Sequence, residues 1–233
     1  MHALQTKRWH EFDSQPDFEQ AACRFILENA ARAITARGAF HIVLAGGNTP
    51  RNIYQQLCTA HTDWSAWHIY FGDERCLAPD NPERNSCMAR SVWLDHVAIP
   101  SAHIHEIPAE LGPEVAAEKY ARAIAQVGNF DLALLGLGED GHTASLFPGG
   151  AWEQSATLAD AIPVRDAPKP PPQRVSLSSA RLSRSECVIF LVTVKGKLDA
   201  VNRWRAGIDL PASRIMPAAG VDVFLNLGDD NKI

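Results

Sequence analysis

The chain has 233 residues, a hydrophobic content of 46% and a formal net charge of −5, and this is enough apolar material for the core of one large domain spanning residues 1–233. The acidic balance disfavours a general nucleic-acid-binding surface, which would need an excess of basic residues. No apolar run is long enough to cross a membrane, and residues 1–8 lack the apolar core of a signal peptide, so we expect no membrane partner.

The five cysteines are widely spread and include no Cys-x-x-Cys pair. They are Cys23, Cys58, Cys76, Cys87 and Cys187. This pattern favours reduced thiols over a disulfide framework or a zinc ribbon, so we expect a cytoplasmic protein. The sequence carries no signal for a particular oligomeric state, and a monomer is the favoured expectation.

The first elements are a long helix and a strand that ends in glycines. Apolar and small residues at helical spacing predict a helix over 17–37, and the apolar run at 40–45 predicts a buried strand. The loop Gly46-Gly47-Asn48-Thr49 follows, before a helix that reaches about residue 57. Glycines and a helix start suit an anion, although an ordinary glycine turn is equally compatible with this loop alone. It is not a Walker loop, because no Gly-Lys-Ser/Thr follows.

A second apolar run, 67–71, predicts a strand that leads into a charged loop containing Asp73, Glu74 and Arg75. A metal pair of Asp73 and Glu74 is disfavoured, because neighbouring side chains on an extended chain point in opposite directions. Arg75 could grip a phosphate with its planar guanidinium, or it could pair internally with one of these carboxylates. Residues 76–84 predict a loop, 85–96 a helix and 113–127 an amphipathic helix.

The sharpest chemical signal follows the apolar run at 130–135, which predicts a buried strand. The strand breaks into glycines and then presents Asp140 and His142. Ligands of open α/β sheets bind beyond the carboxyl ends of the strands, and histidine suits acid–base work near neutral pH. A serine nucleophile at Ser145 is disfavoured, because the Gly-x-Ser-x-Gly elbow is absent. A histidine with a purely structural role is the alternative.

The second half of the chain is irregular from 149 to 172 and includes the stiff proline run 168–172. Strands are predicted at 174–178, 187–193 and 221–226, and the turn 194–197 leads into a helix that ends near residue 206. The alternation of strands and helices predicts an α/β fold with a mainly parallel, Rossmann-like sheet and helices on both faces, in a single domain.

In a parallel sheet the loops that follow these strands lie at one edge. Backbone donors of 46–49 and the cations Arg75, Arg174 and Lys197 are therefore expected near His142. The cations suit a phosphate, and the histidine suits proton transfer. The residues by themselves predict an enzyme acting on a small phosphorylated metabolite, without fixing the reaction.

Five blocks, in this order along the chain, resemble the signature blocks of the 6-phosphogluconolactonase family. They are residues 45–50, 73–75 with the later Asn85, 136–149, 170–175 and 196–197. The resemblance implies hydrolysis of 6-phospho-D-glucono-1,5-lactone to 6-phospho-D-gluconate, a step of the oxidative pentose phosphate pathway, with no cofactor and no metal.

By the same resemblance, His142 would be the general base that activates water, and Asp140 would orient its ring. The substrate-binding residues would be Gly46, Gly47, Asn48, Thr49, Asp73, Arg75, Asn85, Arg174 and Lys197. The chain departs from the family pattern at Ala45 and Asn48, since that loop often reads Ser-Gly-Gly-Ser-Thr. It also has Val194 where a glycine is expected, and this puts the shape of the Lys197 turn in question.

Three other functions are alternatives to lactone hydrolysis. Glucosamine-6-phosphate deaminases resemble this chain in fold and in an Asp-Gly-His block, but they typically carry Asp-Glu-Tyr at 73–75. They also have a catalytic glutamate soon after the histidine, whereas residues 143–150 contain no carboxylate. A sugar-phosphate-sensing regulator would add a helix-turn-helix, for which the residues before the first helix leave no room. A non-catalytic sugar-phosphate-binding module is disfavoured by the intact Asp140 and His142.

Overall fold

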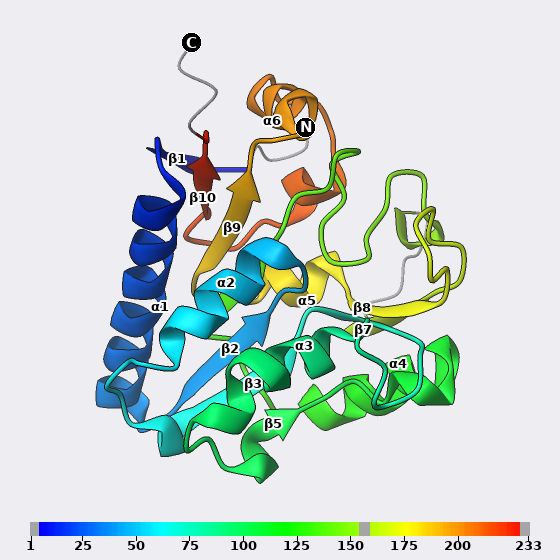
Figure 1. Cartoon of the computed structure of the whole chain (residues 1–233). Helices are drawn as coiled ribbons and strands as arrows, with labels where there is room; N and C mark the ends of the chain where they lie inside the picture. The colour runs from blue at the N-terminus through cyan, green and yellow to red at the C-terminus, as the bar shows by residue number, and fades with distance from the viewer. Residues whose placement is uncertain (1–4, 154–158, 229–233) are drawn as a thin grey trace.

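The computed structural model describes residues 5–153 and 159–228. Part of the segment tested for a signal peptide (1–4) and part of the irregular segment (154–158) lie outside the described residues. The centre is a seven-stranded parallel sheet in the spatial order β1-β10-β9-β6-β2-β3-β5 (Figure 1). Its strands are β1 (Lys7–Phe12), β2 (Phe40–Leu44), β3 (Trp67–Phe71), β5 (Ile104–His105), β6 (Leu132–Leu135), β9 (Val188–Thr193) and β10 (Val221–Asn226).

A second, antiparallel sheet of three strands has the order β4-β8-β7. Its strands are β4 (Asp73–Arg75), β7 (Ala161–Val164) and β8 (Arg174–Leu177). The α-helices are α1 (Gln15–Arg37), α2 (Asn48–Leu57), α3 (Asn85–Val92), α4 (Pro113–Ile124), α5 (Ser179–Ser183) and α6 (Leu198–Arg205).

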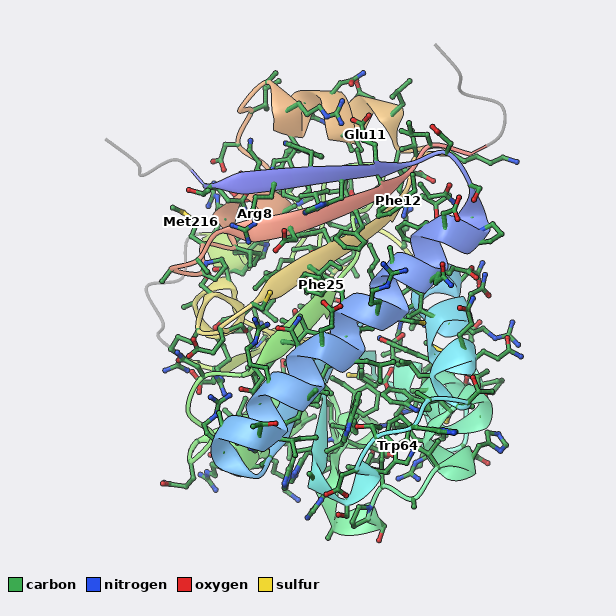
Figure 2. All side chains as sticks on the ribbon, turned by 90° about the vertical axis from the view of Figure 1, so that its left-hand side faces the viewer. Arg8, Glu11, Phe12, Phe25, Trp64 and Met216 are labelled. Atoms are coloured by element: carbon green, nitrogen blue, oxygen red, sulfur yellow. The ribbon has the colours of Figure 1, made fainter. Side chains whose placement is uncertain are left out.

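Helices cover both faces of the parallel sheet, because alternate side chains of each strand point to opposite faces. On one face, Phe12 of β1 packs edge-on against Phe18 of α1, and Figure 2 shows α1 lying across the strands there. On the other face, Trp9 of the same strand packs on Trp204 of α6, with ring centroids 5.4 Å apart. The prediction of a mainly parallel sheet with helices on both faces is confirmed.

Several local predictions were wrong. Residues 73–75, expected as a loop, form β4, and 161–164 of the irregular segment form β7. Residues 174–177 form a strand as predicted, but in the antiparallel sheet. Strand β4 is short and polar, and its partner β8 lies far along the chain, whereas β7 has only four residues and contains a proline, so neither was recognised as a strand. Strands β1 and β5 were also missed, and the helix predicted for 85–96 ends at Val92.

No helix among the described residues is long and apolar enough to cross a membrane.

Strands β2, β3 and β5, together with His103 just before β5, carry a stack of imidazoles on one face of the sheet. The ring centroids of His41 and His68 are 4.6 Å apart, and those of His68 and His103 are 3.9 Å apart. His105 stacks on Tyr70 at 4.6 Å. Parallel rings at these distances pack as aromatic surfaces and bring like-charged groups together whenever they are protonated.

This stack predicts a loss of stability in acid. Burial, followed by the neighbouring His41, His103 and His105, lowers the pKa of His68 from 6.5 to about 4. The unfolded chain then binds more protons than the folded chain below pH 6.5, so Tm should fall as the pH is lowered from about 6.5 to about 4. His68→Phe keeps an aromatic ring but cannot take up a proton, so the dependence of Tm on pH should be weaker in this variant. Equal slopes of Tm against pH in both proteins would contradict the prediction.

Candidate active site

A cavity of about 340 Å³ opens at the carboxyl-terminal edge of the parallel sheet, where the loops after β2, β6 and β9 meet the small sheet. This volume lies in the range of small-molecule sites. The predicted residues that line the cavity are Gly46, Gly47, Asp73, Arg75, Asn85, His142, Arg174 and Lys197. The shared sheet edge therefore brings most of the candidate residues together.

Asp140 meets His142 across a sharp bend in the loop after β6. A carboxylate oxygen of Asp140 lies 2.5 Å from Nδ1 of His142 and 3.1 Å from its backbone nitrogen. The bend passes through Gly141 at φ 90°, a conformation that residues with a Cβ rarely adopt. His142 lines the cavity, whereas Asp140 does not, so the carboxylate reaches the cavity only through the imidazole.

The imidazole of His142 is held between a glycine and an aromatic ring. A Cβ built on Gly138 would lie 2.0 Å from Nδ1 of His142, so only glycine allows the ring to lie against this stretch of backbone. The ring of Phe147 packs on the imidazole with centroids 4.5 Å apart. These two contacts restrict the plane of the imidazole, and Asp140 restricts its rotation within that plane.

The electrostatics of the pair define the tautomer of His142. Burial by itself raises the pKa of Asp140, but hydrogen bonds from the backbone and side chain of His142 outweigh burial and lower it. Asp140 is therefore ionised at neutral pH and can only accept a hydrogen bond. A neutral imidazole facing this acceptor carries its proton on Nδ1, which leaves the lone pair on Nε2.

Asp73 is a buried part of the cavity wall, and both of its carboxylate oxygens are bound. One accepts a hydrogen bond from the Ser145 hydroxyl at 2.6 Å, and the other accepts one from the Asn85 amide at 3.0 Å. Ser145 lies three residues after His142. Asp73 therefore ties β4 and α3 to the loop that carries the imidazole.

Arg75 lines the cavity as predicted, and its guanidinium is only partly used by the protein. Nη1 donates to the carbonyl of Glu83, and the buried Nε has no partner among the described residues. Within the same residues, the side chain forms no ion pair with Asp73 or Glu74, so the internal pairing considered from the sequence is not realised. Arg75 thus keeps positive charge available at the cavity.

Arg174 is largely committed to the protein itself. Its Nε donates to the carbonyl of Pro171 at 3.0 Å, and Nη2 donates to the carbonyls of Lys169 and Pro170 at 2.9 and 3.3 Å. The guanidinium also lies over the ring of Phe147, 5.6 Å from its centroid. Arg174 therefore fastens the proline run to the cavity wall and supports the aromatic ring that packs on the imidazole.

Lys197 ends a tight turn after β9. Its backbone nitrogen donates to the carbonyl of Val194 at 2.7 Å, and Gly196 takes the left-handed position at φ 75°. The glycine expected at position 194 is thus not needed for the turn. Burial lowers the pKa of Lys197, although the charge of Glu139 opposes this shift. Its ammonium forms no ion pair within the part of the chain that the structure describes.

Asn48 and Thr49 form the first turn of α2 and do not line the cavity. The Thr49 hydroxyl lies 3.1 Å from that of Thr193 at the end of β9. The N-cap of α2 is Gly47, and no side chain caps the helix. Among the residues that the structure describes, the first N–H groups of α2 therefore have no side-chain partner, and they lie next to glycines that line the cavity.

Phe147, Lys169 and Glu139 are among the cavity residues to which the sequence assigned no role in substrate binding or catalysis. Lys169 and Glu139 lie 3.6 Å apart as an ion pair at the cavity. The sequence signal that could have identified Lys169 is its positive charge within the stiff proline run. Among the residues described, no group of three or more His, Cys, Asp or Glu side chains is placed to hold a metal ion.

Comparisons with known proteins identify the family of the chain. Residues 13–224 match the family model of glucosamine-6-phosphate isomerases/6-phosphogluconolactonase. The 6-phosphogluconolactonase of Synechocystis sp. is 39% identical over 179 residues, covering 73% of each chain. That of Mycobacterium leprae is 36% identical over 224 residues, covering 90% of each chain.

Solved structures give the same result. The 6-phosphogluconolactonase of Thermotoga maritima matches with a TM-score of 0.88 at 26% identity, covering 95% of this chain and 100% of that one. The enzyme from Trypanosoma cruzi matches with a TM-score of 0.84 at 27% identity, covering 97% and 96%. The chain therefore belongs to the glucosamine-6-phosphate isomerase/6-phosphogluconolactonase family.

Proposed function

We propose that this chain is a 6-phosphogluconolactonase that hydrolyses 6-phospho-D-glucono-1,5-lactone to 6-phospho-D-gluconate, with His142 as general base. The observation that carries the proposal is the 2.5 Å contact between Asp140 and Nδ1 of His142 beside a cavity that also holds Lys197. Lactone hydrolysis needs a base for water and positive groups for the anionic substrate, and the cavity supplies both.

The proposed mechanism follows from the tautomer of His142 that carries its proton on Nδ1. Nε2 of His142 takes a proton from water as the oxygen of that water attacks the lactone carbonyl carbon. The imidazolium that forms is stabilised by the ionised Asp140. When the tetrahedral intermediate collapses, the ring C–O bond breaks and the leaving oxygen takes the proton from Nε2. The product is a carboxylic acid that ionises in water, and the imidazole returns to its starting state.

The phosphate of the substrate is placed at the start of α2. This helix has no side-chain cap, and its first N–H groups carry the positive end of the helix dipole. Lys197 lines the same cavity as Gly46 and Gly47 and has no protein ion-pair partner among the described residues. Arg75, whose buried Nε has no partner among the described residues, lines the same cavity and adds positive charge. Asp73 and Asn85 line the same cavity and contact the sugar hydroxyls in this proposal.

We also place the enzyme in the cytoplasm as a monomeric single domain whose partner is the small phosphorylated lactone, with no nucleic acid, metal or cofactor. All five cysteines are free, and each is partly buried. The acidic net charge of −5 opposes binding to nucleic acid.

The catalytic assignment is tested by removing each member of the pair. His142→Ala should lower kcat by roughly 10² to 10⁴-fold, because that is the usual contribution of a positioned base. Asp140→Asn should lower kcat by a smaller factor, since the base remains but loses its orienting acceptor. The lactone is generated in place with glucose-6-phosphate dehydrogenase, and its decay is compared with spontaneous hydrolysis.

The matched control is His61→Ala, which removes an exposed histidine far from the cavity lining and should leave kcat unchanged. Full activity in His142→Ala would contradict the assignment of His142 as the general base. Loss of wild-type activity in EDTA would point to a metal. Ammonia release from glucosamine 6-phosphate would favour the deaminase alternative, and binding of 6-phosphogluconate without turnover would favour the non-catalytic module.

The phosphate assignment predicts a different kinetic signature for Lys197→Ala. Loss of a charge that contacts the substrate away from the reacting carbon should raise KM by roughly tenfold or more with a smaller change in kcat. Lys195→Ala removes the same charge from an exposed position two residues earlier that does not line the cavity. An equal KM in both variants would contradict the assignment of Lys197.

A further inference from the structure

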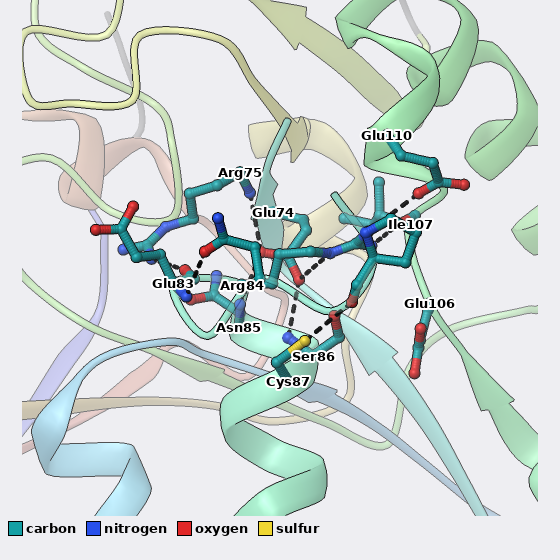
Figure 3. Close-up of polar contacts among 12 residues, drawn as sticks. Glu74, Arg75, Glu83, Arg84, Asn85, Ser86, Cys87, Glu106, Ile107 and Glu110 are labelled. Atoms are coloured by element: carbon teal, nitrogen blue, oxygen red, sulfur yellow. Dashed lines mark hydrogen bonds and ion pairs between the residues drawn. The ribbon is translucent and has the colours of Figure 1, made fainter. Parts of the chain in front are cut away.

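Glu74 is a fully buried carboxylate directly behind the cavity wall, and it has no role in the reaction described above. It is 0% exposed. Its oxygens accept hydrogen bonds from the backbone nitrogens of Asn85, Ser86 and Arg75 at 2.7, 2.8 and 2.9 Å (Figure 3). Because Asn85 and Ser86 are the first residues of α3, Glu74 supplies the cap that no side chain of the helix itself provides.

Arg84, which is 2% exposed, forms an ion pair with this carboxylate, although its buried Nε has no hydrogen-bond partner among the described residues. Its Nε lies 3.6 Å from Glu74, its Nη2 donates to the carbonyl of Ile107 at 2.7 Å, and its Nη1 donates to Glu110 at 3.0 Å. Figure 3 shows these partners gathered around the start of α3. One planar guanidinium thus connects β4 to the segment that precedes α4.

A buried ion pair is poor evidence of a stabilising role. Removing two charges from water costs several kcal/mol per ion, and apolar residues of similar volume often stabilise a fold equally well or better. The value of such a pair lies in fixing one arrangement of the elements that it joins. Glu74 and Arg84 join β4 to α3, and both elements deliver residues to the cavity.

The residue that this arrangement places is Asn85. Its Nδ2 donates to the backbone carbonyl and the carboxylate of Asp73 at 2.9 and 3.0 Å. A Cβ built on Gly46 would lie 1.9 Å from Oδ1 of Asn85, so the amide of Asn85 packs directly against the glycine loop. A small displacement of α3 would therefore move Asp73 and Gly46, which both line the cavity.

We propose that Glu74 and Arg84 are positioning residues that set the substrate-binding wall of the cavity by fixing Asn85 against Asp73 and Gly46. This inference rests on the proposed lactonase function and adds a specificity element to it. The wall faces the polyhydroxylated part of a sugar phosphate, so its displacement weakens substrate binding more than it impairs the base His142.

The test is a double-variant cycle between Glu74 and Asn85. Glu74→Gln keeps the size of the side chain but turns an amide donor toward backbone N–H donors. It should lower kcat/KM roughly tenfold, mainly through KM, in the wild-type background, and by less than about twofold in the Asn85→Ala background. The decrease in Tm caused by Glu74→Gln should be similar in both backgrounds, which separates positioning from folding.

A second variant and a control keep the test decisive. Arg84→Lys preserves the charge but cannot reach all three partners, and it should reproduce the rise in KM if Glu74→Gln fails to fold. Asp222→Asn removes another buried acceptor, bound to Arg8 and His10 far from the cavity, and should lower Tm without changing KM.

The positioning role would be overturned if Glu74→Gln lowered kcat/KM by the same factor in the wild-type and Asn85→Ala backgrounds. It would also be overturned if KM were unchanged in both Glu74→Gln and Arg84→Lys. That outcome leaves lactone hydrolysis by the wild type intact. A wild-type protein that does not hydrolyse the lactone would instead reject the proposed function, and the positioning role with it.

Discussion

The contact between Asp140 and His142 is the constraint on which the rest of the site depends. Two residues this close in sequence meet only because Gly141 takes a left-handed conformation and Gly138 leaves space for the ring. The loop can hold this shape because it starts at β6, a buried central strand, and because the Ser145 hydroxyl is bound by Asp73. The parallel sheet therefore positions His142, and the small antiparallel sheet secures the loop that carries it.

The positive groups of the cavity do not all act in the same way. In the proposed function, Lys197 and the start of α2 bind the anionic substrate, whereas Arg174 donates its hydrogen bonds to the backbone carbonyls of the proline run. Arg174 supports His142 indirectly, through Phe147. Under the proposed function, the cations along this sheet edge therefore divide into groups that bind the substrate and groups that hold the cavity walls.

The sequence predicted five of the seven strands of the parallel sheet, because these five are apolar runs such as that of β9, and it predicted the sheet edge where His142, Arg75 and Lys197 meet. It could not predict β1 and β5, which lack such a run, or the antiparallel sheet, in which the short, polar β4 pairs with β8 far along the chain. The burial of Glu74 was hidden because it depends on the placement of α3, which no local pattern shows. The hydrogen-bond partners of Arg174 lie only a few residues before it, but the conformation of the proline run that turns these carbonyls toward the guanidinium could not be predicted from the sequence.

The central claim is that an ionised Asp140 holds His142 in the tautomer with its proton on Nδ1, so that Nε2 is free to take a proton from water. Nitrogen-15 NMR of labelled histidine measures this tautomer directly in the wild type and in Asp140→Asn. The account predicts a proton on Nδ1 of the neutral His142 ring in the wild type and a shift of the tautomer in the variant. A wild-type ring with its proton on Nε2, or a tautomer that does not respond to Asp140→Asn, would contradict it.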